Sequence, residues 1–182
     1  MCGNGTFIID VIGRGGHASQ PEACRDPLLA ASAITLALQQ IVSRRLSPQA
    51  AAVISVTQFN AGTAPTVIPE TAQLGGSIRV PDESTRHTIN QLITEVATQT
   101  AASWGVQCTV THEPRYQATI NHAAPATQAR QAWVDLFGAE TLQHGHPMPI
   151  MASEDFSYYL QAIPGAFALI GSDDGQGHHV PC

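Results

Sequence analysis

The residues whose types could do chemistry lie near the two ends of the chain. Near the start, His17 stands in the glycine-rich segment 13–21 (GRGGHASQP). Near the end, two carboxylates occur in residues 153–156 (SEDF), and two imidazoles occur in residues 178–181 (HHVP). Histidine exchanges a proton near neutral pH, and carboxylates serve as acids, bases or metal ligands. Together these groups are the parts of a hydrolytic site. Taken alone, His17 could equally be a histidine of an ordinary surface loop.

The surroundings of His17 predict that its side chain is displayed and not packed in a core. An apolar run, residues 7–12, precedes the segment and predicts a strand over residues 6–13. The glycines that follow indicate a backbone that turns sharply or lies close to another part of the molecule.

The first two thirds of the chain predict a β-α-β-β-α-β order. One helix begins at Asp26-Pro27, an N-cap followed by proline at the first helical position, and ends before Pro48. A second begins within residues 81–84 and stops at Gly105. The predicted strands cover residues 6–13, 51–59, 73–80 and 106–112, with a loop at 60–69. This order predicts a ferredoxin-like unit, one sheet with both helices on a single face.

After Tyr116 the pattern changes. We expect a helix over residues 123–137, a polar loop at 143–149, a short helix over 153–160 capped by Ser153, and a buried strand at 166–171. Residues 117–182 hold too few elements for a core of their own, which is typical of one piece of a larger layer. The fold class is therefore α+β, with a domain over residues 6–116 and a fragment over 117–182.

Composition excludes several functions. Of 182 residues, 43% are hydrophobic, and the net charge is −6. All eight basic residues are arginines and they are scattered, so we expect no nucleic-acid partner and no binding to anionic membranes. We see no secretory leader and no apolar run of about 18 residues.

The cysteines give no sign of a structural metal site. The four cysteines are Cys2, Cys24, Cys108 and Cys182, and none form a CxxC pair. Their sparse placement favours a reduced, cytoplasmic environment.

Eight short motifs, in order, are similar to those of one family. They are residues 13–18 (GRGGHA), 26–27 (DP), 62–64 (GTA), 67–70 (VIPE), 76–79 (GSIR), 153–159 (SEDFSYY), 164–165 (PG) and 179–181 (HVP). In these the chain resembles the amidohydrolase branch of the aminoacylase and glutamate carboxypeptidase family of dinuclear metallohydrolases. The resemblance implies a catalytic α/β domain with two metal ions and an inserted lid domain that also dimerises. Residues 6–116 would be that lid, and residues 117–182 the end of the catalytic domain.

The resemblance also implies roles for single residues. His17 matches a lid histidine that donates to the substrate carbonyl oxygen in the partner subunit's site. Arg79 matches an arginine that grips the substrate carboxylate, for which a planar guanidinium is suited. His179 matches the last metal ligand, whereas we take His178 as solvated. The alternatives are a surface-loop His17, an exposed strand-end Arg79 and a solvated His179 near the chain end.

Three positions need separate comment. Thr66 stands at a substrate-binding position where the family commonly has Asn, and it lacks the amide's paired donor and acceptor. Glu22 stands where this branch often has a second histidine. By the resemblance, Glu154 would border the metal site without ligating the metal. The alternative is that Glu154 and Asp155 are ordinary acidic residues at the start of a helix.

The family's first half, which carries most metal ligands, has no counterpart here. One imidazole cannot hold a hydrolytic metal, which needs about three protein ligands. We therefore expect the complete enzyme to carry two ions of zinc, manganese or cobalt, and this chain alone to bind none and be inactive. Two hypotheses follow: part of a homodimeric enzyme that cleaves N-acyl amino acids, or a non-catalytic dimerisation module.

Overall fold

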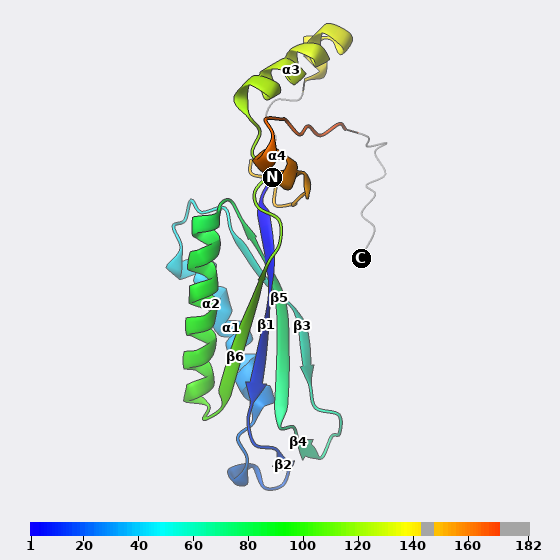
Figure 1. The fold of residues 1–182 in the computed structure, drawn as a ribbon. Coiled ribbons are helices and arrows are strands. Elements are labelled where there is room, and N and C mark those ends of the chain that lie inside the picture. The colour runs from blue at the N-terminus through cyan, green and yellow to red at the C-terminus, as the bar shows by residue number, and fades with distance from the viewer. Residues whose placement is uncertain (143–147, 172–182) are drawn as a thin grey trace.

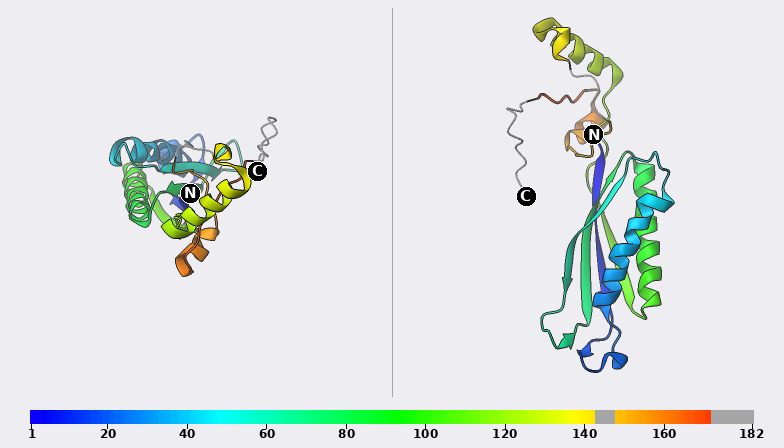
Figure 2. Two further views of the ribbon diagram at one scale, coloured as in Figure 1. Left: turned by 90° about the horizontal axis from the view of Figure 1, so that it is seen from above. Right: turned by 180° about the vertical axis from the view of Figure 1, so that it is seen from behind.

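The computed structural model describes residues 1–142 and 148–171, and its main feature is a four-stranded antiparallel sheet (Figure 1). The strands are β1 (Gly3–Ile12), β3 (Val53–Ala61), β5 (Thr71–Val80) and β6 (Gln107–Pro114). Their order across the sheet is β3-β5-β1-β6. Helices α1 (Pro27–Gln40) and α2 (Glu83–Ser103) lie side by side on one face and leave the other face open (Figure 2). The predicted ferredoxin-like arrangement is confirmed.

Alternating side chains of the strands form the core. Phe7, Ile9 and Val11 of β1 point toward the helices, and Leu74 and Ile78 of β5 lie beside them. The helices complete this core with the apolar stripes expected from their spacing, which are Ala31, Ile34 and Leu38 of α1 and Ile89, Ile93 and Val96 of α2. Because a shift of one residue would turn every strand side chain to the opposite face, this core fixes the register of the sheet.

The predicted helix starts are confirmed by their capping contacts. Asp26 Oδ1 accepts hydrogen bonds from the backbone N–H groups of Leu28 (2.8 Å) and Leu29 (3.3 Å). Asp82 Oδ1 accepts one from Thr85 N–H at 2.7 Å. α1 continues into the π-helical turn η2 (Ile41–Arg45), and α2 is followed by Gly105, which adopts a left-handed φ of 68°. Asp26 and Gly105 are the cap and stop predicted from sequence, and Asp82 lies within the predicted start at residues 81–84.

The predicted loop at residues 60–69 contains a short strand that sequence patterns missed. β4 (Val67–Ile68) pairs with β2 (Gly16–His17), and the short helix η1 (Pro21–Ala23) follows β2. A strand of two residues is too short to show a period in the sequence, so only its partner reveals it.

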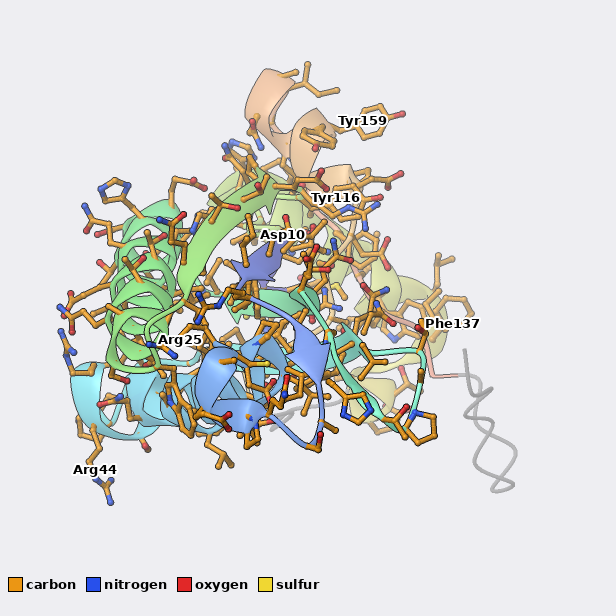
Figure 3. The ribbon with its side chains drawn as sticks, turned by 90° about the horizontal axis from the view of Figure 1, so that it is seen from below. Asp10, Arg25, Arg44, Tyr116, Phe137 and Tyr159 are labelled. Atoms are coloured by element: carbon orange, nitrogen blue, oxygen red, sulfur yellow. The ribbon has the colours of Figure 1, made fainter. Side chains whose placement is uncertain are left out.

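The C-terminal region, which we define as residues 115–171, contains α3 (Ala123–Phe137), η3 (Ala139–Thr141) and α4 (Phe156–Ala162). The bounds predicted for α3 are correct. The predicted short helix begins three residues later than expected, at Phe156, so its N-cap is Asp155 and not Ser153. In Figure 3, Phe137 and Tyr159 point outward, away from the sheet.

The buried strand predicted at residues 166–171 is wrong. These residues form no helix or strand, and Leu169 and Ile170 are 61% and 70% exposed. A buried strand needs partner strands at its edges and a layer on each face, and the described residues around it supply neither.

None of the helices in residues 1–142 and 148–171 combines the length and apolar character needed to cross a membrane.

Candidate functional site

The His17 loop is held at one end of the sheet by pairing with the segment around β4 (Figure 1). His17 is the register partner of Val67. On either side of this pair, Ala18 N–H donates to Thr66 O and Gly13 N–H donates to Glu70 O, both at 2.9 Å. The structure thus brings His17 and Thr66, two of the predicted site residues, into neighbouring positions.

Close approach of other backbone and side-chain atoms explains the glycines around His17. A Cβ atom at Gly13 would lie 2.1 Å from Arg25 O, and one at Gly15 would lie 2.6 Å from Ile68 O. Neither glycine has a positive φ. Of the two reasons that the sequence allowed, it is therefore the close packing of the backbone that requires glycine.

The contacts of the His17 ring determine which nitrogen carries the proton. Ser19 N–H donates to His17 Nδ1 at 3.2 Å, and Ser19 Oγ lies 2.7 Å from the same atom. A backbone N–H can only donate, so Nδ1 is an acceptor and the neutral ring carries its proton on Nε2. The side chain is exposed. His17 can therefore offer an N–H to an oxygen that develops negative charge, the role of an oxyanion-hole donor.

Arg79 lies near the opposite end of β5, beside the C-terminal region. Its Nη1 donates to Ser153 Oγ at 2.7 Å, and the side chain is half-buried. Glu154 is the next residue along and is also half-buried. Within residues 1–142 and 148–171, its carboxylate makes no hydrogen bond and no ion pair. Arg79 and the segment that carries Glu154 therefore form a second cluster.

The two clusters cannot act on one small substrate within a single copy of the chain. The His17 loop joins the sheet at the Thr71 end of β5, whereas Arg79 is the ninth of its ten residues. At about 3.3 Å per residue, these ends are roughly 26 Å apart. His17 and Arg79 can meet at one substrate only if two copies of the chain contribute to the site.

The described residues do not fit a dinuclear metal centre by themselves. Among them, no three His, Cys, Asp or Glu side chains are grouped closely enough to hold a metal ion. His179 and His178 lie outside the described residues, so the predicted ligand role of His179 stays a prediction.

The thiols of Cys2 and Cys108 do not add a nucleophile to the site. Cys2 is fully buried, and burial raises the pKa of its thiol. Burial raises the pKa of the Cys108 thiol in the same way. Both thiols therefore stay protonated at neutral pH, whereas the thiolate is the reactive form.

Sequence reasoning missed Arg86, which is 3% exposed and is the only buried charged residue of the described part of the chain. A signal was present in its spacing. Arg86 precedes Ile89 by three positions and Ile93 by seven, so the helical period places it on the inner face of α2. A charged residue on an apolar stripe is the exception that needs a specific partner.

Comparison with known proteins identifies the family. A model of the peptidase dimerisation domain matches residues 2–105. The hippurate hydrolase of Campylobacter jejuni is 34% identical over 96% of this chain and 45% of its own length. The N-acetyl-L-cysteine deacetylase of Bacillus subtilis is also 34% identical, over 96% of this chain and 41% of its own length.

A solved structure gives the same result. The YXEP protein of Bacillus subtilis, a dinuclear metal binding peptidase of the M20 family, superimposes with a TM-score of 0.68. It is 27% identical, and the match covers 91% of this chain and 39% of that one. The chain belongs to the M20 family of peptidases and amidohydrolases, and it spans less than half the length of these relatives.

Proposed function

We propose that this chain forms the lid and the C-terminal end of a metal-dependent amidohydrolase that cleaves N-acyl amino acids. Support comes from relatives named as a hippurate hydrolase and an N-acetyl-L-cysteine deacetylase. The observation that carries the proposal is the geometry of His17: its Nδ1 accepts from Ser19 N–H, so its Nε2 edge is left to face a ligand from an exposed loop held by backbone pairing. This is the donor needed where amide cleavage builds charge on the carbonyl oxygen.

The enzyme works as a homodimer in this proposal, with residues 6–116 as the domain through which it pairs. The distance between the two clusters and the match to a peptidase dimerisation domain support this arrangement. His17 of one subunit donates to the substrate carbonyl oxygen in a site that contains Arg79 of the other subunit.

The remaining site residues act on the substrate and its surroundings. Arg79 binds the free carboxylate of the N-acyl amino acid through its guanidinium. Thr66 lies beside His17 and offers a hydroxyl to the substrate where the family commonly has an amide. Glu154, beside Arg79, borders the metal site and bears a carboxylate without a described partner.

The metal ions belong to the complete enzyme. Two divalent ions, zinc, manganese or cobalt, supply the Lewis acid and the activated water when they are bound. His179 is the ligand that this chain contributes, and the chain alone binds no metal and is inactive. With net charge −6 and free thiols at Cys2, Cys24 and Cys108, we place the protein in the cytoplasm, without nucleic-acid or membrane partners.

Intersubunit complementation tests this function. Residues 1–182 replace the matching 45% of the C. jejuni hippurate hydrolase, and hippurate hydrolysis is measured with zinc, manganese or cobalt added. His17→Ala and Arg79→Ala should each abolish most activity in homodimers. Mixing the two variants should restore about a quarter of the wild-type rate, because half of the random dimers are mixed and each has one intact site.

The control is His87→Ala, which removes an exposed histidine on α2 and should leave the rate unchanged. If His17→Ala hydrolyses hippurate as fast as the wild type, the donor role is wrong. If both single variants lose activity and mixing restores none, the two residues do not serve one site across the dimer.

A second function deserves testing because the matched family model is that of the dimerisation domain alone. In this alternative the chain is a non-catalytic pairing module. Both ideas expect the 182-residue chain alone to pair without binding metal, so amidase activity of the hybrid protein is the measurement that separates them. A chain that forms a dimer in sedimentation but gives no amidase activity in the hybrid protein, with metal added, favours the module.

A further inference from the structure

The chain enters the sheet at the start of β1 and leaves it at the end of β6, and both points lie at the same end of the sheet. The two backbone segments at these points, which we call the two crossings, are hydrogen-bonded to each other. Asn4 N–H donates to Tyr116 O at 2.9 Å, and Arg115 N–H donates to Asn4 O at 3.1 Å. The side chain of Asn4 adds a third bond, since its Oδ1 accepts from Tyr116 N–H at 2.9 Å. We call these three residues, with Arg86, the crossing clasp.

Arg86 reaches the clasp from α2 and binds both crossings at once. Its Nη1 donates to Asn4 O, and its Nη2 donates to Tyr116 O at 2.8 Å. Its Nε donates to Glu83 Oε2 at 3.0 Å, an ion pair whose carboxylate side is exposed. Each of the three guanidinium nitrogens therefore has an acceptor, as a buried charge requires.

The fit is specific for a guanidinium and for the residues around it. A Cβ atom at Gly3 would lie 2.9 Å from Arg86 Nη2 and 2.8 Å from Tyr116 O. Only a planar fork can bond two carbonyl groups with two separate N–H donors in a fixed geometry. The ammonium group of lysine is a single point charge and would hold one crossing better than the other.

The clasp lies directly beside Arg79. Asn4 is the register partner of Arg79 in the β1–β5 ladder. Two residues earlier, Cys2 N–H donates to Ile150 O (2.9 Å) and to Ala152 O (3.1 Å), next to the Ser153 that accepts from Arg79. The beginning of β1 therefore connects both partners of the Arg79–Ser153 contact.

We propose that Arg86 is a positioning residue that holds Arg79 against the Ser153–Glu154 segment through the crossing clasp. Arg86 does not touch the substrate itself. By fixing Asn4 and Tyr116 together, it sets where the sheet meets the C-terminal region, and so it sets where the Arg79 guanidinium lies. The part of this inference that concerns substrate rests on the function proposed above for Arg79.

Amide hydrogen exchange in the 182-residue chain tests the clasp without any activity. Arg86→Gln should speed exchange at Asn4, Arg115 and Tyr116 by about tenfold or more, while amides in the middle of β5 keep their protection, because only a local opening is made easier. Arg86→Lys should give an intermediate effect. The matched control is Glu83→Gln, which removes the exposed negative charge but keeps an oxygen that can accept from Arg86 Nε, so it should exchange like the wild type.

Two outcomes overturn the clasp. One is unchanged protection of Asn4, Arg115 and Tyr116 in Arg86→Gln. The other is a loss of exchange protection that is as large in the middle of β5 as at these three amides, which would mean that Arg86 contributes only to global stability. If Arg86→Gln does not fold, Asn4→Ala provides the test, because it removes only the Oδ1 bond and should loosen the same amides to a smaller extent.

Kinetics of the hybrid enzyme test the link to Arg79. Arg86→Gln should raise KM for hippurate more than it lowers kcat, and it should add little in an Arg79→Ala background, because coupled residues are not additive. Equal effects in both backgrounds contradict the positioning role. If Arg79→Ala itself leaves KM unchanged, the proposed function of Arg79 fails, while the exchange result on the clasp still stands.

Discussion

The N-terminal region, residues 3–114, and the C-terminal region, residues 115–171, differ in what their apolar side chains contact. The first contains nearly all the buried hydrophobic residues that the structure describes, whereas the second contributes only Leu160. No residue of α3 is buried. The aromatic side chains of the C-terminal region contact rings of the same region, as in the Trp133–Phe137 pair within α3 at 4.6 Å and the Phe156–Phe167 pair at 5.5 Å between ring centroids.

This difference shows that a well-formed helix is not the same as a packed one. α3 has good helical spacing and the bounds predicted from sequence, yet none of its residues is buried, and Leu136 and Phe137 are 74% and 54% exposed. The ribbon shows this helix standing away from the sheet (Figure 2). Tertiary burial supplies most of the stability of helices in proteins. We therefore expect the N-terminal region to unfold as one cooperative unit and the C-terminal region to contribute little to that transition.

Substitution of one phenylalanine in each region is the most sensitive test of this difference in packing. Phe7 is 1% exposed in the sheet core, whereas Phe137 is 54% exposed at the end of α3. Phe7→Ala should lower the free energy of unfolding by about 3–5 kcal/mol, the usual cost of emptying a core site. Phe137→Ala should change it by less than about 0.5 kcal/mol.

The measurement can separate the regions because the chain has two tryptophans. Trp104 follows α2 and Trp133 lies in α3. Urea unfolding is followed by fluorescence in Trp133→Phe, so that Trp104 alone reports the N-terminal region. A large loss of stability with Phe137→Ala in this background would contradict the independence of the two regions.

The same contrast explains which parts of the fold were predictable. Asp26, Asp82 and Gly105 mark helix boundaries through local backbone chemistry, so their effect is visible in the sequence itself. The predicted strand at residues 166–171 has the composition of a buried strand, but a strand depends on partners far away in sequence. Where the described residues supply no partner, the composition alone misleads.

The candidate site shows the same division between local and distant information. The glycine-rich segment identified His17 as a displayed residue because the signal is local. The pairing of His17 with Val67, the roughly 26 Å along β5 that separates its loop from Arg79, and the fork of Arg86 across Asn4 and Tyr116 all depend on distant contacts. No spacing rule within one segment could give them.

Helix capping gives a second, smaller test of the comparison. Asp26 caps α1 with two side-chain hydrogen bonds, whereas Asp155 caps α4 with none. Asp26→Ala should therefore cost about 0.5–2 kcal/mol, the usual value for a lost cap. Asp155→Ala should leave the Trp104 transition unchanged. Equal losses from the two substitutions would show that the C-terminal region is part of the same cooperative unit.

The smallest expected effect is a pH dependence that belongs to the N-terminal region. His112 of β6 is half-buried, with Nε2 2.9 Å from Thr94 Oγ1. Burial lowers the pKa of His112 below its ordinary 6.5, a shift that the Asn90 carbonyl opposes. Between the folded pKa and 6.5, the unfolded chain binds more protons at this site than the folded chain does. Stability should therefore rise with pH in this window and fall as the solution is acidified.

Unfolding of the N-terminal region, reported by Trp104, should lose part of its pH sensitivity below about 6.5 in His112→Gln, because an amide cannot take up the proton. Thr94→Val keeps the imidazole and is the matched control, so it should retain the acid sensitivity. If the free energy of unfolding of His112→Gln depends on pH as steeply as that of the wild type, this imidazole does not contribute to the pH dependence. In a Trp104→Phe background, the Trp133 signal should be insensitive to the His112 substitution, because α3 does not pack against β6.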